Sequence, residues 1–150
     1  MLIFVLDHQP IASEMMSMLI HRLHPEARIV TASSLKQLNK LIDKYEGIDF
    51  LIIEPQSTGC IGALTVDHLS KRLPNTELIV FTDTELDVIG ETYFKNGANH
   101  IICKRYNIKE ITNNLQIFLS NKDLSESADS TSDVGFIKIS KRHRQLINFL

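Results

Sequence analysis

The sequence predicts an α/β domain in which strands and helices alternate five times, giving a parallel sheet with helices on both faces. Two observations lead to this fold class. Short apolar runs recur along the chain and end at turn residues or polar side chains, which is typical of strands buried on both faces. Segments with apolar residues at helical spacing separate the runs, and strands joined by helical crossovers pair in parallel.

The strands are marked by these apolar runs. The clearest is Phe50–Ile53, which leads directly into the carboxylate of Glu54. The run at Arg28–Ala32 is more polar, so we expect it nearer an edge of the sheet. In chain order, the expected strands are Leu2–Leu6, Arg28–Ala32, Phe50–Glu54, Leu78–Phe81 and Ile101–Cys103.

The helices are marked by their ends and by their apolar spacing. Pro10 suits the first position of a helix, where its missing N–H is no loss. Ser33 or Ser34 can cap the second helix, and Gly97 stands just past the fourth. We expect the third helix around 64–73, the fourth around 85–96 and the last around 108–119. The expected core face is Ile11, Met15, Met18, Leu19 and Leu23 on the first helix, and Ile108, Ile111, Leu115 and Phe118 on the last.

The order of the strands is predicted from the number of strand–helix units and from the absence of a dinucleotide-binding motif. No GxGxxG sequence follows the first strand, so the flavodoxin-like order 2-1-3-4-5 fits five units better than a dinucleotide-binding fold. Residues 1–120 are then one domain, and 121–136 form a flexible linker because they are acidic and rich in serine. Residues 137–150 resume structure, with Ser140 as a helix cap.

Composition narrows the class of protein. A hydrophobic content of 43%, a charged content of 23% and a net charge of −2 are ordinary for a globular protein and give no overall basic surface for nucleic acid. Cys60 and Cys103 form no metal-type or redox motif, which favours a reducing, cytoplasmic setting. No apolar run approaches the length of a membrane span, so we expect no membrane partner.

Four polar side chains stand at the carboxyl ends of the expected strands. Asp7, Glu54, Thr82 and Lys104 follow or end strands one, three, four and five. Strands one and three flank the point where the strand order reverses, so Asp7 and Glu54 should face each other there. Carboxylates hold Mg²⁺, and a lysine and a hydroxyl meet phosphoryl oxygens. The pattern indicates a site for an oxyanion with a divalent cation.

These motifs resemble a known family. The sequence is similar to the receiver domain of two-component response regulators over residues 1–120, on the segments Val5–His8, Phe50–Glu54, Val80–Thr82 and Asn96–Lys104. The segment Ile137–Ile147 resembles the opening of a LuxR-type helix-turn-helix domain. The whole resembles a NarL/FixJ-type transcriptional regulator whose DNA-binding module is cut off near its first helix.

The resemblance implies a signalling module that is not an enzyme. It implies a homodimer, a protein partner or histidine kinase, and DNA bound through a complete helix-turn-helix domain. Phosphate contacts from Lys141, Arg142 and Arg144 would give this chain only nonspecific DNA affinity. Thr82, Lys104 and Ile101 are the equivalents of the residues that contact phosphate or switch state.

The departures from the family pattern change the expected chemistry. Glu54 stands where receivers carry the phospho-accepting aspartate, and Leu6 stands where they carry a second acid. Phosphoryl transfer depends on positioning, and misplacement by about 1 Å can cost ~10²-fold in rate. We therefore expect weak or absent Mg²⁺ binding by Asp7 and Glu54, and no resident cofactor. Ile101 replaces the family's switch aromatic, so the usual relay from Thr82 is absent or altered.

The leading hypothesis is an atypical receiver that works without phosphorylation, with Glu54 and Lys104 forming a fixed ion pair. It would act as a dimerisation or protein-interaction module through its first and last helices. One alternative is a working, Mg²⁺-dependent receiver that takes phosphate on Glu54 or Asp7. The other is an unrelated flavodoxin-like protein that binds a nucleotide or flavin, although its loops lack a phosphate-cradling run of glycines.

Overall fold

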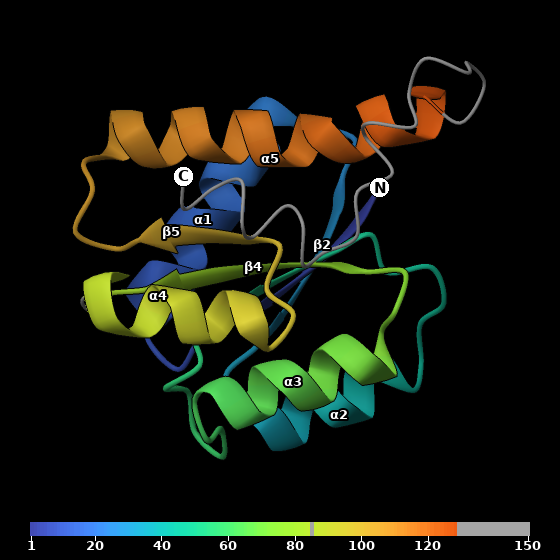
Figure 1. The fold of residues 1–150 in the computed structure, drawn as a ribbon. Coiled ribbons are helices and arrows are strands. Elements are labelled where there is room, and N and C mark those ends of the chain that lie inside the picture. Colours follow the sequence, from blue (N-terminus) through green and yellow to red (C-terminus); the bar gives the residue numbers. More distant parts are fainter. Residues whose placement is uncertain (85, 129–150) are drawn as a thin grey trace.

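A computed structural model describes residues 1–84 and 86–128. Five parallel strands form one sheet in the order β2-β1-β3-β4-β5, which confirms the predicted fold class and strand order (Figure 1). The strands are β1 (Leu2–Leu6), β2 (Arg28–Ala32), β3 (Phe50–Ile53), β4 (Glu77–Thr82) and β5 (His100–Cys103). The helices are α1 (Pro10–Leu23), α2 (Leu35–Ile42), α3 (Ala63–Arg72), α4 (Leu86–Lys95) and α5 (Ile108–Ala128).

The helices form a layer on each side of the sheet. Figure 1 shows α1 and α5 together on one side and α2, α3 and α4 on the other. Successive strand residues point to opposite faces, so Ile3 and Ile52 pack beneath α1 and α5, whereas Phe4 and Leu51 pack on the other side. Because both faces are covered, the central strands are apolar on both, and β3 is completely buried.

The ends of several elements follow local chemistry. The Ser34 hydroxyl accepts a hydrogen bond from the Gln37 backbone N–H (3.2 Å), which makes Ser34 the cap of α2. Helix α5 continues to Ala128, so residues 121–128, predicted as the start of a flexible linker, are helical. The remainder of the predicted linker and the predicted start of a helix-turn-helix domain lie outside the described residues.

The predicted core faces of α1 and α5 need correction. Ile11 and Met18 on α1 are 84% and 59% exposed, whereas Met16 and Ile20 are fully buried. Helix α1 carries more apolar residues than one face can bury, and the face centred on Met16, Leu19 and Ile20 is the one that meets the sheet. On α5, Ile108 is 58% exposed because it is the first residue of the helix, whereas the predicted core residues Ile111 and Leu115 are buried.

Gly97 permits a close approach between the end of α4 and helix α3. Its φ is +108°, a conformation that favours glycine, and an added Cβ would overlap the hydroxyl of Ser70. Gly47 has a similar φ of +71° but no heavy atom within 4 Å of such a Cβ. Substitutions at both positions would strain the backbone, but only a substitution at Gly97 would also crowd a neighbouring side chain.

We predict that Gly97→Ala destabilises the protein by about 1–3 kcal/mol more than Gly47→Ala does, since only the first substitution adds overpacking to the backbone cost. Urea unfolding of the two variants and the wild type measures the difference. Equal losses for both variants would contradict the crowding at Ser70.

Candidate functional site

The predicted site residues meet at the carboxyl edge of the sheet. Backbone hydrogen bonds between neighbouring parallel strands fix the positions of these residues. The Glu54 N–H donates to the Leu6 carbonyl (2.9 Å), and the Lys104 N–H donates to the Thr82 carbonyl (2.8 Å). The Asp7 N–H donates to the carbonyl of Ala32 (3.1 Å). Asp7, Glu54 and Thr82 are all buried at this edge.

Lys104 joins the two carboxylates. Its ammonium nitrogen lies 2.8 Å from Asp7 Oδ2 and 3.5 Å from Glu54 Oε1. The side chain of Lys104 is 10% exposed, and those of Asp7 and Glu54 are 2% and 3% exposed. Buried carboxylates without a counter-ion are costly. One internal cation therefore compensates two buried acids.

Two residues that sequence analysis did not single out complete this arrangement. Gln9 Oε1 accepts a hydrogen bond from the Lys104 ammonium (2.9 Å), and the Gln9 N–H donates to Asp7 Oδ1 (2.9 Å). Ser57, in the loop after β3, accepts a hydrogen bond from the His8 N–H through its hydroxyl (3.2 Å). Gln9 follows an acid and precedes Pro10, where its sequence context signals only a helix start. Its role could be found only from the tertiary structure.

Burial dominates the ionisation of Glu54. It raises the pKa of this carboxyl above its usual value of 4.5, and the charge of Asp7 raises the pKa further, whereas the Thr82 hydroxyl and Lys104 lower it. A raised pKa in the folded state means that the folded protein binds this proton more tightly than the unfolded chain does. Glu54 therefore contributes stability below about pH 4.5 that is lost as the pH rises through its folded pKa.

Thr82 and Ile101 differ in their relation to this site. The hydroxyl of Thr82 lies 3.1 Å from that of Thr84 and is completely buried. Ile101 pairs with Val80, two residues back from the edge, and is packed partly buried against the core under α2, α3 and α4. Its side chain has no hydroxyl with which to enter a polar network. The predicted phosphate contacts Lys141, Arg142 and Arg144 lie outside the described residues.

The donor set at this edge does not fit a resident metal ion. Within residues 1–84 and 86–128, no group of three or more His, Cys, Asp or Glu side chains is placed to hold one. The two carboxylates that do meet are already in contact with an ammonium group, whereas Mg²⁺ needs several oxygen ligands in octahedral geometry. In the same part of the chain, no helix is both long and apolar enough to cross a bilayer.

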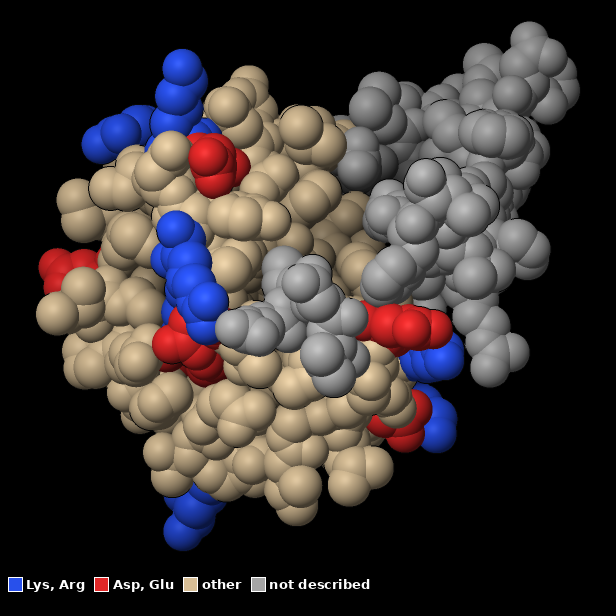
Figure 2. All heavy atoms as spheres, turned by 60° about the vertical axis from the view of Figure 1, so that its left-hand side comes forward, with Lys and Arg blue, Asp and Glu red and all other residues tan. Residues whose placement is uncertain are grey.

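Apolar side chains surround the site. Figure 2 shows this side of the molecule as a mostly uncharged surface with scattered acids and bases. The exposed apolar residues near the carboxyl edge come from the starts of α1, α3 and α5 and from two loops, and they are Ile11, Leu64, Ile108, Ile61 and Tyr106. Among the described residues on this face, the lysines and arginines are scattered between uncharged side chains.

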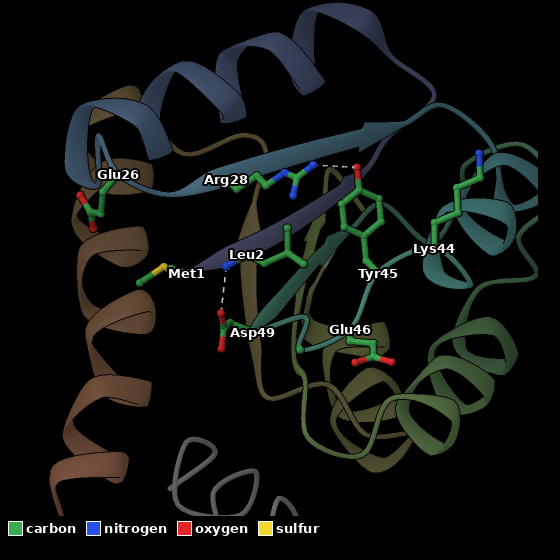
Figure 3. Close-up of a pocket in the computed structure, with 9 residues that line it drawn as sticks. Met1, Leu2, Glu26, Arg28, Lys44, Tyr45, Glu46 and Asp49 are labelled. Atoms are coloured by element: carbon green, nitrogen blue, oxygen red, sulfur yellow. Dashed lines mark hydrogen bonds between the residues drawn. The ribbon is translucent and has the colours of Figure 1, made fainter.

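A hollow in the surface borders the site. A hollow of about 470 Å³ lies between α1 and β2 and is lined by Asp7 and His8 together with serine and threonine side chains. A larger hollow of about 740 Å³ lies at the opposite, amino edge of the sheet (Figure 3). There Arg28 lies over the ring of Tyr45, and Asp49 accepts a hydrogen bond from the Leu2 N–H (2.8 Å). The larger hollow contains none of the predicted site residues.

Comparison with known proteins identifies the fold. No protein-family model and no curated protein sequence matches the chain. Several solved structures of receiver domains do. The signal receiver domain of the DNA-binding response regulator protein merR from Colwellia psychrerythraea 34H has a TM-score of 0.70 and 16% identity over 79% of this chain and 98% of its own.

Two further solved structures agree. The signal receiver domain of an HD domain-containing protein from Pseudomonas fluorescens Pf-5 has a TM-score of 0.70 and 17% identity over 84% of this chain and 91% of its own. The beryllofluoride-activated NtrC4 receiver domain dimer has a TM-score of 0.63 and 16% identity over 73% of this chain and 88% of its own. The chain therefore has the fold of receiver domains.

We predict that Lys104→Met destabilises the protein by about 3–5 kcal/mol at pH 7, because it leaves two buried carboxylates without their cation. Loss of the Lys104 charge raises the pKa of Glu54 further. The deficit should therefore be largest at neutral pH and should shrink as the pH falls towards 4.5, because the folded variant then takes up a proton on Glu54. Urea unfolding across this pH range measures it.

Lys71→Met is the matched control, because Lys71 forms an exposed ion pair with Asp67 (3.0 Å). Its removal should cost less than about 1 kcal/mol. A similar, pH-independent loss in both lysine variants would contradict the proposed role of Lys104.

Proposed function

We propose that the chain is an atypical receiver module of a response regulator, whose site is held in one state by internal ion pairs and works without phosphorylation. The observation that carries this proposal is the position of Lys104, whose ammonium contacts both Asp7 and Glu54. Such a module acts through binding rather than catalysis, and we place it in the cytoplasm.

The residues at the site support a fixed state. Glu54 is one methylene longer than an aspartate, and its carboxylate is buried beside Lys104. A nucleophile must be presented to the donor, and phosphoryl transfer is mostly positioning and charge stabilisation. Leu6, where a second acid would help to hold Mg²⁺, is a fully buried core residue. Both departures support a site that works without Mg²⁺ and without a phosphoryl group.

The alternative function is a working, Mg²⁺-dependent phosphoreceiver. One observation favours it, because Asp7, Thr82 and Lys104 surround the Glu54 position as a phosphoryl site would require. Phosphate would then be carried by Glu54 or Asp7. The two functions differ in whether the wild-type chain reacts with a phosphodonor.

We predict that wild-type protein gains no phosphoryl group from acetyl phosphate and Mg²⁺, whereas Glu54→Asp reacts at a rate higher by ~10²-fold or more, because it withdraws the carboxylate by about one methylene. Intact-mass spectrometry measures the adduct. Glu54→Gln is the control, since it keeps the length but has no nucleophile. A stable adduct on the wild-type chain would favour the phosphoreceiver.

We propose that α1 and α5 form the interaction surface, with a second copy of the chain as its partner. The two helices contact each other on one face of the sheet (Figure 1). On α1, Ser13 and Ser17 face β2 across the smaller hollow, so Ile11 and Met18, about two turns apart, lie on the flank towards α5. Ile117 adds a 56% exposed side chain on α5.

The proposal also concerns the partners of the chain. One solved structure of this fold is a receiver domain dimer. Another comes from a DNA-binding response regulator, and we propose DNA as a partner through a complete helix-turn-helix domain, not as a specific ligand of residues 1–150. A histidine kinase or another protein is a further candidate partner.

We predict that Met18→Lys weakens self-association by about tenfold or more, because it places a charge in a desolvated apolar contact. Sedimentation equilibrium over a concentration series measures the dissociation constant, with no phosphodonor present. Ile61→Lys is the control, since Ile61 is 70% exposed but precedes α3 on the other side of the sheet. A monomer at every concentration, or equal effects of the two variants, would contradict the α1–α5 surface.

A further inference from the structure

Tyr93, on α4, has a buried hydroxyl group with no clear hydrogen-bond acceptor among the described residues. The residue is 1% exposed and belongs to the core cluster that also contains Ile53 and Val80. In the described part of the chain its hydroxyl meets no partner with the geometry of a hydrogen bond, although the Gln56 side chain lies near enough to influence it. Buried polar atoms of this kind are uncommon, and most are satisfied by a protein group or by an ordered water.

Glu54 carries the complementary atom. Lys104 approaches Oε1, whereas Oε2 is buried and has no hydrogen-bond partner among residues 1–84 and 86–128. An ionised carboxylate only accepts hydrogen bonds, and a tyrosine hydroxyl can donate one. The site thus has one unmatched acceptor, and the neighbouring core has one unmatched donor.

Packing places the two groups in the same region. Tyr93 belongs to the core cluster that contains Ile53 and packs against Cys60. Ile53 and Cys60 lie on either side of Glu54 in the sequence. Burial raises the pKa of the Tyr93 hydroxyl, the Gln56 side chain lowers it, and the negative charge of Glu54 raises it. Cys60, in the same loop as Gln56, has its pKa raised to about 11 by burial and by the charge of Glu54. Both neighbours therefore keep their protons at neutral pH, and of the two the hydroxyl is the stronger donor.

We propose that Tyr93 is a positioning residue for Glu54: its hydroxyl donates to Glu54 Oε2 through one ordered water and ties α4 to the site. Lys104 then holds one oxygen of the carboxylate and Tyr93 holds the other. This inference rests on the proposed function as a fixed-state receiver. It identifies α4 as the helix that is linked to Glu54. Ile101, which has no polar atom in its side chain, cannot provide that link from β5.

The first test is the NMR chemical shift of the Glu54 carboxyl carbon at pH 7 in the wild type, Tyr93→Phe and Tyr45→Phe. Tyr45 is the matched control, because its hydroxyl lies 3.4 Å from the Arg28 guanidinium, at the amino edge of the sheet. We expect the shift to change in Tyr93→Phe and to stay at the wild-type value in Tyr45→Phe. An unchanged shift in Tyr93→Phe would overturn the inference.

A double-mutant cycle gives a second readout that loss of packing alone would not produce. Glu54→Leu removes both carboxylate oxygens, and the effect of Tyr93→Phe on the unfolding equilibrium constant is measured with and without it. We expect the two effects to be coupled by about tenfold. Additive effects would count against the link. If Glu54→Leu does not fold, Glu54→Gln takes its place, with a smaller coupling expected because one acceptor oxygen remains.

The two proposals can fail separately. A phosphoryl adduct on wild-type protein together with a changed carbon shift in Tyr93→Phe would overturn the fixed state but keep the Tyr93 link. No adduct together with an unchanged shift would overturn the link alone.

Discussion

The carboxylates of Asp7 and Glu54 are buried at the carboxyl edge of a parallel sheet, where a charge without a counter-ion is costly. The rest of the site depends on Lys104, which supplies that counter-ion. The ammonium contacts Asp7, Glu54 and Gln9 at once. Asp7 and Gln9 follow β1, Glu54 follows β3 and Lys104 itself follows β5, so one side chain connects three segments that are distant in the sequence. The burial that raises the pKa of Glu54 also strengthens its attraction to Lys104, because the local dielectric is low.

The sheet explains why these charges meet. Parallel strands end on the same edge, and the order β2-β1-β3-β4-β5 places β1 and β3 next to each other at the point where the order reverses. Charged side chains in the interior of the buried sheet would be costly. The polar side chains therefore stand at or just beyond the carboxyl ends of the strands. The fold therefore brings these side chains together whichever acid follows β3. We propose that Glu54 gives the group a fixed structural role in place of a phosphorylation site.

Much of this could be predicted from the sequence. The bounds of β1 and β2 are the predicted ones. Asp7, Glu54 and Lys104 meet at the strand ends as expected, and the Thr82 hydroxyl influences Glu54. Helical spacing was less informative for α1, because Ile11 and Met18 have the spacing of core residues but lie on an exposed flank. The extension of α5 to Ala128 was missed because serine and acidic residues favour linkers only on average. Gln9 gave no local signal, since its contact with Lys104 depends on a residue far away in the chain.

The central claim is that the site stays in one state without a ligand. Its most direct test is the amide NMR spectrum of the wild-type chain during titration with Mg²⁺ and beryllofluoride, a phosphoryl analogue. The account predicts that the amide signals of Glu54, Thr82 and Lys104 stay in place, because the internal ion pairs already satisfy the carboxylates. Saturable shifts at these three residues that spread into α4 would show a site that still binds and switches, and would contradict it.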